Sequence, residues 1–558
     1  MFFPHQGPWT NWIDDYAADG VLACRPRTAG ELVAIVEYAV TEGKRIRAVG
    51  AAHSTTSVAR PDDILVLPDN LHGKLEIDFL RSSWERKRGD LVRLKAGTRL
   101  KAANRDLLGD KAVLNMGSFD WQTMIGAIST GTHGSGIGLG PMAESVRSIE
   151  MVTVREVDGQ PDIGLRRIEP AEGITDADAF NRPGRALDIE LIQDDDTFYS
   201  AVVSFACIGL VYSLTLEVRD AYWLDEENEL KPWSEVERML EAGPHPRFDY
   251  ELPRVLAENR HWEFLVNCAE VQGKKATEDP TCFVRERNML GEEPRKPADW
   301  NDKKHDWPPR RVPDCWTRDL AEDYARPGID RRKGKGIGYL TKNALQKDAS
   351  RPPFEGDFHC SRNYWVLRRE RDDTRLPDEE PEPPPDAISN EIAVPLENTV
   401  AAVRRILDLM AENEYFYPVP FGVRFVGPSQ HYLAPQYGRP TCMIEIPLVL
   451  PNKSKKRQRE MVEFKEALGR IERSLCYGGG HLGGRPHWGQ YNELDRERLE
   501  ELYDRLPEFE RTYSTHNAFG TFDNDYTRQI GLRRVRVDEP EAEEPDLTAL
   551  RVAADHLL

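Results

Sequence analysis

The sequence lacks a long apolar run, a paired-cysteine motif and an excess of basic residues. None of its apolar runs approaches the roughly 20 residues that cross a bilayer, so we expect no membrane partner. The N-terminal residues 1–12 lack a charged head followed by an apolar stretch, which predicts no secretory signal. The eight cysteines are scattered and form no CxxC pair, a pattern typical of reduced thiols and not of a zinc site. We therefore predict a cytoplasmic protein without a metal site.

The charge balance is acidic, with a formal net charge of -20 at pH 7. Such a balance argues against nucleic acid or an anionic membrane as the main partner. Hydrophobic residues make up 39% and charged residues 30% of the chain, as in ordinary globular proteins. A length of 558 residues predicts two or more domains and a sizeable core. The oligomeric state does not follow from these numbers.

The first part of the chain, residues 1–220, alternates helix-like and strand-like segments with glycine-rich turns. Its first helix begins after Thr28, where Thr-x-x-Glu forms a capping-box pattern, and ends at Gly43. Strands are expected at 45–49, 64–67, 91–96, 149–154 and 210–218. This pattern predicts an α+β domain.

The composition and periodicity of the sequence change after residue 220. The stretch 270–385 is charged and proline-broken, and it is expected to be an expansion within a larger domain. The proline-rich segment 377–386 predicts an extended surface loop. Strand-like order resumes at 390–394, and the acidic tail 538–546 is expected to be exposed and partly disordered.

Small residues surround a histidine in the first stretch that carries chemistry, Val49-Gly-Ala-Ala-His-Ser-Thr55. The turn follows a predicted strand, and its small side chains allow the backbone to approach a ligand closely. Successive backbone N–H groups in such a turn can bind an anion. A purely structural turn is the alternative at this point.

The second stretch runs from Gly126 to Gly136 and holds four glycines and four hydroxyl side chains in eleven residues. This composition disfavours a packed helix and favours a loop whose N–H groups and hydroxyls surround phosphates. It matches neither GxGxxG nor a Walker loop. Tight-turn glycines without a ligand are the alternative.

Taken together and in order, these motifs resemble the vanillyl-alcohol oxidase flavoprotein superfamily, and in particular its sugar-lactone and alditol oxidase branch, which includes D-arabinono-1,4-lactone oxidase. The resemblance covers the chain outside about 270–385. Its motifs are Arg25 to Thr28, the His53-Ser54 turn, Gly131 to Gly136, Asp196 to Tyr199, Ile208 to Val211, Arg485 to Gln490, and Phe519 to Tyr526.

The resemblance implies a two-subdomain FAD-binding domain (1–220), a cap domain with a large antiparallel sheet (221–480), and a C-terminal segment (481–558) that returns to the FAD domain. It also implies FAD bonded covalently through His53 to the flavin 8α-methyl group. The residues that it implies for cofactor binding are Val49, Gly50, Ala51, Ala52, His53, Ser54, Thr55, Asn115, Met116, Gly117, Ser118, Gly126, Ala127, Thr130, Gly131, Thr132, His133, Gly134, Ser135, Gly136, Ile137, Gly209 and Val211.

The sequence departs from this family on the substrate side. The family's Glu-x-Arg pair reads Gly422-x-Arg424, so the arginine is present and the glutamate is missing. The lysine of the His-Trp-Gly-Lys motif is replaced by Gln490, next to the retained His487. Arginine stays protonated at any working pH and cannot take a hydroxyl proton.

The base must therefore be sought elsewhere. Glu391, Glu445, His487 and Tyr432 are the candidates, and Arg424 and Gln490 complete the predicted catalytic set. Glu445 shares one face of an alternating strand with Met443, where its carboxylate could replace the missing one or simply be exposed. A structural ion pair is the alternative for Glu391. His133 reads as a hydrogen-bonded loop histidine.

The resemblance implies oxidation of a CH–OH group by hydride transfer to flavin N5, with O2 as acceptor and hydrogen peroxide as product. A dehydrogenase that uses another acceptor is the nearest alternative, and Ala127 is a candidate for controlling oxygen access. A flavoprotein without turnover, or a flavin-free domain, are further alternatives. The two missing charges predict a small-molecule alcohol other than an alditol or aldonolactone, with 270–385 shaping the pocket mouth.

Overall fold

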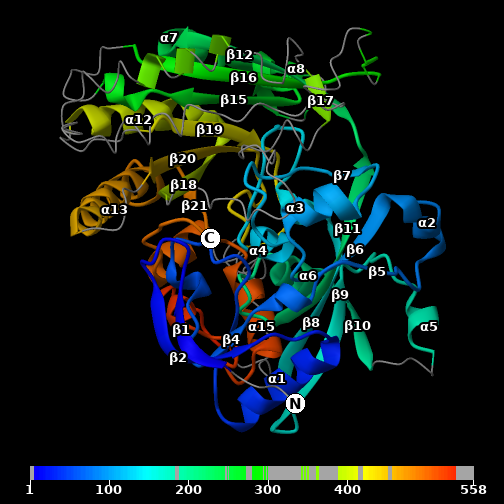
Figure 1. Ribbon diagram of the computed structural model, residues 1–558. Coiled ribbons are helices and arrows are strands. Elements are labelled where there is room, and N and C mark those ends of the chain that lie inside the picture. Colours follow the sequence, from blue (N-terminus) through cyan, green and yellow to red (C-terminus); the bar gives the residue numbers. More distant parts are fainter. Residues whose placement is uncertain are drawn as a thin grey trace, which may run out of the picture.

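The chain folds into two units that lie one above the other in the computed structural model (Figure 1). The lower unit contains the strands and helices up to Asp220 together with the C-terminal helices. The upper unit is built on one large sheet. The structure describes residues 5–182, 188–245, 248, 250–271, 279–292, 294–296, 298, 341–343, 345–346, 349–350, 360–362, 387–412, 419–449 and 455–535.

The first layer of the lower unit is a four-stranded sheet in the order β1-β2-β4-β3, packed against α1. As predicted, Thr28 caps α1 by accepting a hydrogen bond from the Glu31 backbone N–H, and Gly43, with a positive φ of 60°, follows its end. The elements of this layer are β1 (His5–Thr10), β2 (Ala17–Cys24), α1 (Ala29–Thr41), β3 (Ile46–Ala48) and β4 (Ile64–Val66).

The second layer is a seven-stranded sheet in which β8 and β11 are central. Its apolar side packs against the C-terminal helices and forms the larger core of the lower unit, which includes Trp488 and Tyr526. Its elements are β5 (Lys74–Leu75), α2 (Ser82–Glu85), β6 (Leu91–Lys95), α3 (Leu100–Ala102), β7 (Lys111–Val113), α4 (Met124–Ser129), β8 (Val146–Val157), β9 (Gln160–Glu169), α5 (Ala177–Phe180), β10 (Ile189–Gln193), α6 (Asp195–Ala201), β11 (Leu210–Asp220), α14 (Arg496–Leu502), α15 (Leu506–His516) and α16 (Asp525–Gln529).

The upper unit is an eight-stranded antiparallel sheet in the order β17-β12-β16-β15-β19-β20-β18-β21. Alternate residues of each strand point to the same face of the sheet, so the apolar residues gather on one face. That face packs against helices that include α12 and α13. The elements of this unit are β12 (Trp223–Pro232), α7 (Trp233–Met239), β13 (Ala242–Pro244), β14 (Glu251–Pro253), α8 (Arg254–Glu258), β15 (His261–Val266), β16 (Thr281–Met289), β17 (Cys360–Arg362), β18 (Ala387–Pro395), α12 (Thr399–Glu412), β19 (Phe421–Val426), β20 (Thr441–Val449), α13 (Lys455–Cys476) and β21 (Arg485–Pro486).

Three expectations need correction. The predicted expansion 270–385 contains β16, a strand inside the large sheet between β12 and β15. Its arginines hid the period-two pattern, because Arg285 and Arg287 lie on a buried polar face instead of facing solvent. Residues 126–129, expected to be loop, belong to α4, since Thr123 caps that helix. The cap sheet also continues past residue 480 through β21.

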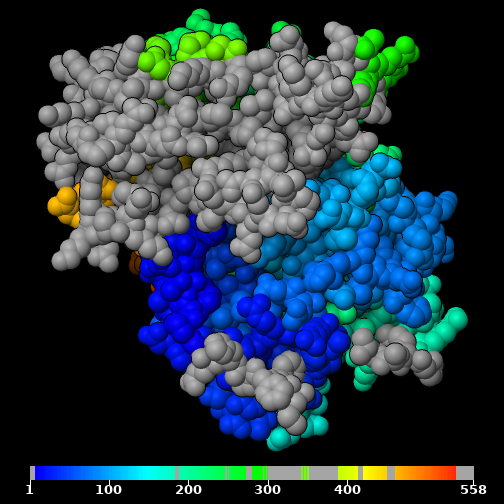
Figure 2. All heavy atoms as spheres, in the orientation of Figure 1, coloured from blue at the N-terminus to red at the C-terminus, as the bar shows by residue number. Residues whose placement is uncertain are grey.

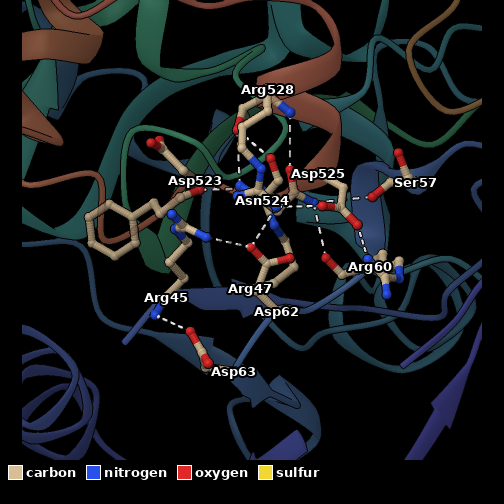
Figure 3. A network of polar contacts seen from close by, with 12 residues as sticks. Arg45, Arg47, Ser57, Arg60, Asp62, Asp63, Asp523, Asn524, Asp525 and Arg528 are labelled. Carbon is tan, nitrogen blue, oxygen red and sulfur yellow. Dashed lines mark hydrogen bonds and ion pairs between the residues drawn. The ribbon is translucent and has the colours of Figure 1, made fainter. Parts of the chain in front are cut away.

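A network of hydrogen bonds and ion pairs joins the C-terminal segment to the first layer (Figure 3). Asn524 Nδ2 lies within hydrogen-bond distance of three backbone carbonyls, those of Ser57, Val58 and Arg60, at 3.0–3.1 Å. Asp525 forms an ion pair with Arg60. The predicted closing motif thus fixes the chain just downstream of the His53 turn. The proline-rich segment 377–386 and the tail 538–546 lie outside the described residues.

Candidate functional site

The His53 turn follows β3 and bends sharply, because Ala52 adopts a positive φ of 57°. A Cβ added at Gly50 would overlap Oγ1 of Thr123, so only glycine fits there. The C-terminal end of the turn is bonded to the C-terminal segment, since Thr55 N–H donates to Gly489 O at 2.9 Å. The sequence prediction of a close-approach turn is therefore supported by the local geometry.

Two aromatic rings flank the His53 imidazole. The ring of Trp12 lies 4.3 Å from it, centroid to centroid, and the ring of Phe119 lies 4.5 Å away on an edge. Burial, with a smaller contribution from Arg99, lowers the pKa of His53 to about 3. The imidazole is therefore neutral at physiological pH and keeps a nitrogen lone pair.

The second glycine segment packs directly against residues 115–117. Gly131 and Gly136 have positive φ values of 86° and 106°, which non-glycine residues rarely adopt. A Cβ at Gly134 would overlap Asn115 Oδ1 and the Met116 carbonyl oxygen. The two predicted cofactor segments therefore meet.

Both glycine segments lie beside buried polar atoms that have no hydrogen-bond partner among the described residues. Oγ1 of Thr55, in the first turn, is one of them. Nε2 of His261 is the other; its Nδ1 lies 2.9 Å from the carbonyl oxygen of Ser135 in the second loop. Turns that are rich in glycine and other small residues, with unpaired buried polar atoms beside them, fit a large polar cofactor such as FAD. His261 was missed by the sequence reasoning, because a single histidine at the start of a strand carries no distinctive signal.

Gly209 and Val211 lie at the start of β11, where a Cβ at Gly209 would collide with the Val152 carbonyl oxygen of β8. Ala127 is fully buried in the lower core. The remaining predicted cofactor residues Val49, Ala51, Ser54, Gly117, Ser118, Thr130, Thr132 and Ile137 lie within or next to these two segments.

One side of the cap sheet carries charged residues, and we call it the polar face; it is defined by Glu263, Arg424, Glu445 and Glu391. Register places all four on the same side, since Glu263 pairs with Arg424 and Glu445 pairs with both Gly422 and Glu391. The bridge between Gly136 and Val426 joins the end of β19 to the second glycine loop. The polar face therefore lies beside the predicted cofactor segment.

Arg424 is the centre of this face. Its Nη1 lies 3.2 Å from Glu445 Oε2 and 3.7 Å from Glu391 Oε1, and its Nε lies 3.5 Å from Glu263 Oε2. Burial alone would lower the pKa of the guanidinium, but the three carboxylates raise it. Arg424 stays charged and neutralises carboxylates that would otherwise repel one another.

Gly422 leaves room for a carboxylate from the neighbouring strand. A Cβ placed there would meet only Leu265 Cδ2 within 4 Å, at 3.4 Å. Glu445 lies directly opposite on β20. Glu445 therefore reaches Arg424 from across the strand pair, and its replacement of the missing glutamate stays a prediction.

Glu391 and His133 form a buried pair, with His133 Nε2 3.0 Å from Glu391 Oε1. The Nδ1 of His133 lies 2.8 Å from the carbonyl oxygen of Gly134, an acceptor, so this nitrogen carries a hydrogen. The other ring nitrogen, Nε2, faces the carboxylate in a buried ion-pair contact. Burial raises the pKa of Glu391, but His133, His487 and Arg424 hold it below its ordinary value.

His487 lies behind this pair, with its ring centroid 6.5 Å from that of His133. Its Nδ1 accepts the Gly489 backbone N–H at 3.1 Å, which leaves the hydrogen on Nε2. Burial lowers the pKa of His487 to about 4, so the ring is neutral. His487 is therefore placed to donate, and not to act as the base.

Two predicted residues have other partners. Gln490 Oε1 accepts a hydrogen bond from Ser389 Oγ at 2.6 Å. Ser389 lies two residues before Glu391 on β18, so the two side chains point to the same face. The Tyr432 hydroxyl bonds to Asp196 and lies 3.0 Å from Arg505, and burial raises its pKa to about 12. Tyr432 is therefore not part of the polar face.

The sequence reasoning missed two carboxylates and two arginines on this side of the sheet, and one of the carboxylates is Glu263 of the polar face. Arg285 contacts Glu263 at 3.1 Å, and Arg287 contacts Glu226 at 2.6 Å. All four side chains are buried. The apolar run Cys282-Phe-Val284 was the available strand signal, but it lay in the stretch read as an expansion.

Comparison with known proteins agrees with this arrangement. The family model D-arabinono-1,4-lactone oxidase matches residues 386–530, and an FAD-binding domain model matches residues 21–156. L-gulono-1,4-lactone dehydrogenase of Mycobacterium tuberculosis is 22% identical over 523 residues, covering 94% of this chain and 98% of the relative. L-gulonolactone oxidase of Scyliorhinus torazame is 22% identical over 535 residues, covering 92% and 96%. The crystal structure of cholesterol oxidase from B. sterolicum gives a TM-score of 0.63 at 13% identity, covering 95% of this chain and 98% of that one.

The two family models and the curated relatives define an FAD-dependent oxidoreductase that acts on a CH–OH group, and the fold is similar to that of vanillyl-alcohol-oxidase-type flavoproteins. Its relatives are named as lactone dehydrogenases, lactone oxidases and an alditol oxidase. The predicted fold class and FAD dependence are confirmed. Within the described residues, no helix is long and apolar enough to span a bilayer.

Proposed function

We propose that this enzyme oxidises a secondary or primary hydroxyl of a polyhydroxy compound or related alcohol and passes the electrons to O2, releasing hydrogen peroxide. The names of relatives, L-gulonolactone oxidase, D-arabinono-1,4-lactone oxidase and alditol oxidase, support a substrate of this kind. The polar face carries the proposal, because it brings an arginine and three carboxylates to the side of the second glycine loop.

Glu445 is the proposed proton acceptor. Its side chain is 26% exposed, whereas those of Glu391 and Glu263 are 6% exposed, so it is the polar-face carboxylate that solvent and substrate reach most easily. Arg424 Nη1 holds it in place at 3.2 Å, and a carboxylate so placed can accept a proton from the substrate hydroxyl. Glu391 is already paired with His133 at 3.0 Å, which makes it the weaker candidate.

The other residues bind and orient. Arg424 holds the substrate oxygen as its proton leaves, and the Nε2–H of His487 supplies a neutral donor. The two glycine segments would hold FAD, which when bound accepts the hydride of the substrate C–H bond. His53 is the proposed covalent tether, supported by its neutral imidazole and its position in the first turn.

The tether has a direct test. Acid-precipitated protein should keep its yellow colour in the pellet, whereas a His53→Ala protein should release its flavin to the supernatant. A wild-type supernatant that contains all the flavin would exclude the covalent bond without touching the assignment of FAD as cofactor.

The reaction has a separate test. A panel of alcohols is mixed anaerobically with the enzyme, and bleaching of the flavin absorbance identifies substrates. We expect xylitol and gulonolactone to react slowly, because Gln490 replaces a lysine of the family's motif and the carboxylate beside Arg424 comes from β20 instead of β19. Peroxide formation is then compared with dye reduction for the best substrate. Faster turnover with the dye than with O2 would identify a dehydrogenase, as one relative is named.

A further inference from the structure

The His53 side chain has an unusual environment for a residue in a cofactor turn. It is held by ring contacts from two distant segments, Trp12 before β2 and Phe119 before α4. Neither imidazole nitrogen has a hydrogen-bond partner within the part of the chain that the structure describes. The rings therefore restrict its orientation while leaving both nitrogens unblocked.

The N-terminal segment is fixed to the turn through its backbone as well. Trp12 N–H donates to Ala52 O at 3.0 Å, and Asn11 Nδ2 donates to Ser54 O at 3.0 Å. Asn11 is itself buried, and its Oδ1 accepts the backbone N–H groups of Asp15 and Tyr16. The turn that holds the Trp12 indole is thus hydrogen-bonded to the residues on both sides of His53, at the carbonyl oxygens of Ala52 and Ser54. In Figure 2 the blue N-terminal residues form part of the surface of the lower unit.

We propose that Trp12 and Phe119 are positioning residues that hold the His53 imidazole in the orientation from which its nitrogen bonds to the 8α-methyl carbon of FAD. This inference rests on the proposed function, which makes His53 the tether. Attachment breaks one C–H bond of the methyl group and one N–H bond of the imidazole and forms one N–C bond. Two protons and two electrons are released in total, and dioxygen takes them to give hydrogen peroxide.

Orientation matters because the reaction is intramolecular once FAD is bound. A nucleophile held near its target reacts much faster than one that rotates freely. In His53 no hydrogen bond to a ring nitrogen sets that angle, so the two rings must do so. Removal of either ring leaves a gap of aromatic size, into which the imidazole can turn.

The test separates attachment from binding. Full-length Trp12→Ala and Phe119→Ala proteins are compared with wild type for total FAD in the native protein and for the fraction that stays in the acid pellet. We expect total FAD to fall less than about twofold and the rate of attachment to fall about tenfold. Trp12→Phe and Phe119→Tyr should restore attachment, because each keeps a ring. Trp84→Ala, which removes an indole from α2 that stacks on Lys87, is the matched control and should attach normally.

Three results would overturn the inference. Attachment at the wild-type rate in both alanine variants would show that the rings are not needed. Parallel loss of native FAD and covalent FAD, without rescue by the ring-keeping variants, would show a structural role only. Complete release of flavin from wild-type protein would remove the tether itself, and this result alone would also count against the covalent part of the proposed function.

Discussion

Glu445 and Gly422 occupy directly opposite positions of neighbouring strands, where side chains of an antiparallel pair lie about 5 Å apart. A carboxylate on either strand can therefore reach Arg424. In this chain it comes from β20 instead of β19. The Arg424–Glu445 distance of 3.2 Å is the shortest of the three ion pairs that Arg424 makes with carboxylates on the polar face.

This relocation predicts the outcome of a swap. Glu445→Ala should lower kcat by roughly 10²- to 10⁴-fold, as expected for loss of a general base. Adding Gly422→Glu should recover at least about tenfold of that loss, because the space beside Leu265 is open. Gly422→Glu alone should lower activity, since two carboxylates would face each other. Steady-state kinetics on the best substrate measures all three.

The control for the swap is Glu391→Gln. It keeps the size of the side chain and removes the negative charge that pairs with His133. If this variant loses more activity than Glu445→Ala, and the swap recovers nothing, Glu391 is the base and the assignment of Glu445 is wrong.

At the scale of elements, the short helix α16 fastens the C-terminal segment to the first layer. Asn524 serves both partners: its Oδ1 caps α16 by accepting the Thr527 N–H, and its Nδ2 reaches three carbonyls after the His53 turn. In Figure 3 its side chain points into the centre of the network. One residue thus joins chain segments more than 460 positions apart, since the Asn524–Ser57 bond spans 467 residues.

Asn524→Ala should therefore be strongly destabilising. Loss of the cap costs about 1 kcal/mol, and leaving buried carbonyls unpaired costs about 1–3 kcal/mol more. Asn524→Ser keeps a capping oxygen and should lose less. Urea unfolding followed by flavin fluorescence measures both. Equal stability of the alanine and wild-type proteins would show that α16 is not needed to hold this region.

At the scale of the whole molecule, stability should depend on pH through Glu472 of α13. This carboxyl is buried and accepts hydrogen bonds from Asn390 Nδ2, the Tyr477 hydroxyl and the Glu493 N–H. Burial raises its pKa from 4.5 to about 7. The folded protein therefore holds a proton that the unfolded chain releases above about pH 4.5.

The sign follows from this difference. The contribution of a neutral Glu472 is complete below pH 4.5, declines as pH rises through about 7, and is lost above it. The loss amounts to about 3 kcal/mol. Glu472→Gln stays neutral, so its thermal midpoint should fall less than that of wild type between pH 5 and pH 8. Glu497→Gln, which changes an exposed carboxyl on α14, is the control and should follow wild type.

The sequence by itself determined the two glycine-dependent turns, the first helix with its Thr28 cap, and the presence of Arg424 on a cap strand. These features are local, because glycine-dependent turns and helix caps are set by neighbouring residues. Only the tertiary structure decided which carboxylate faces Arg424, that His133 pairs with Glu391, and that the Trp12 ring lies against His53. The carboxylates around Arg424 depend on the register of strands far apart in the chain, and a one-residue shift would turn those side chains to the other face. The other two contacts join loops that the fold brings together. The composition of β16 could not reveal its place in the sheet for the same reason, since its arginines are paired only by strands that the chain supplies elsewhere.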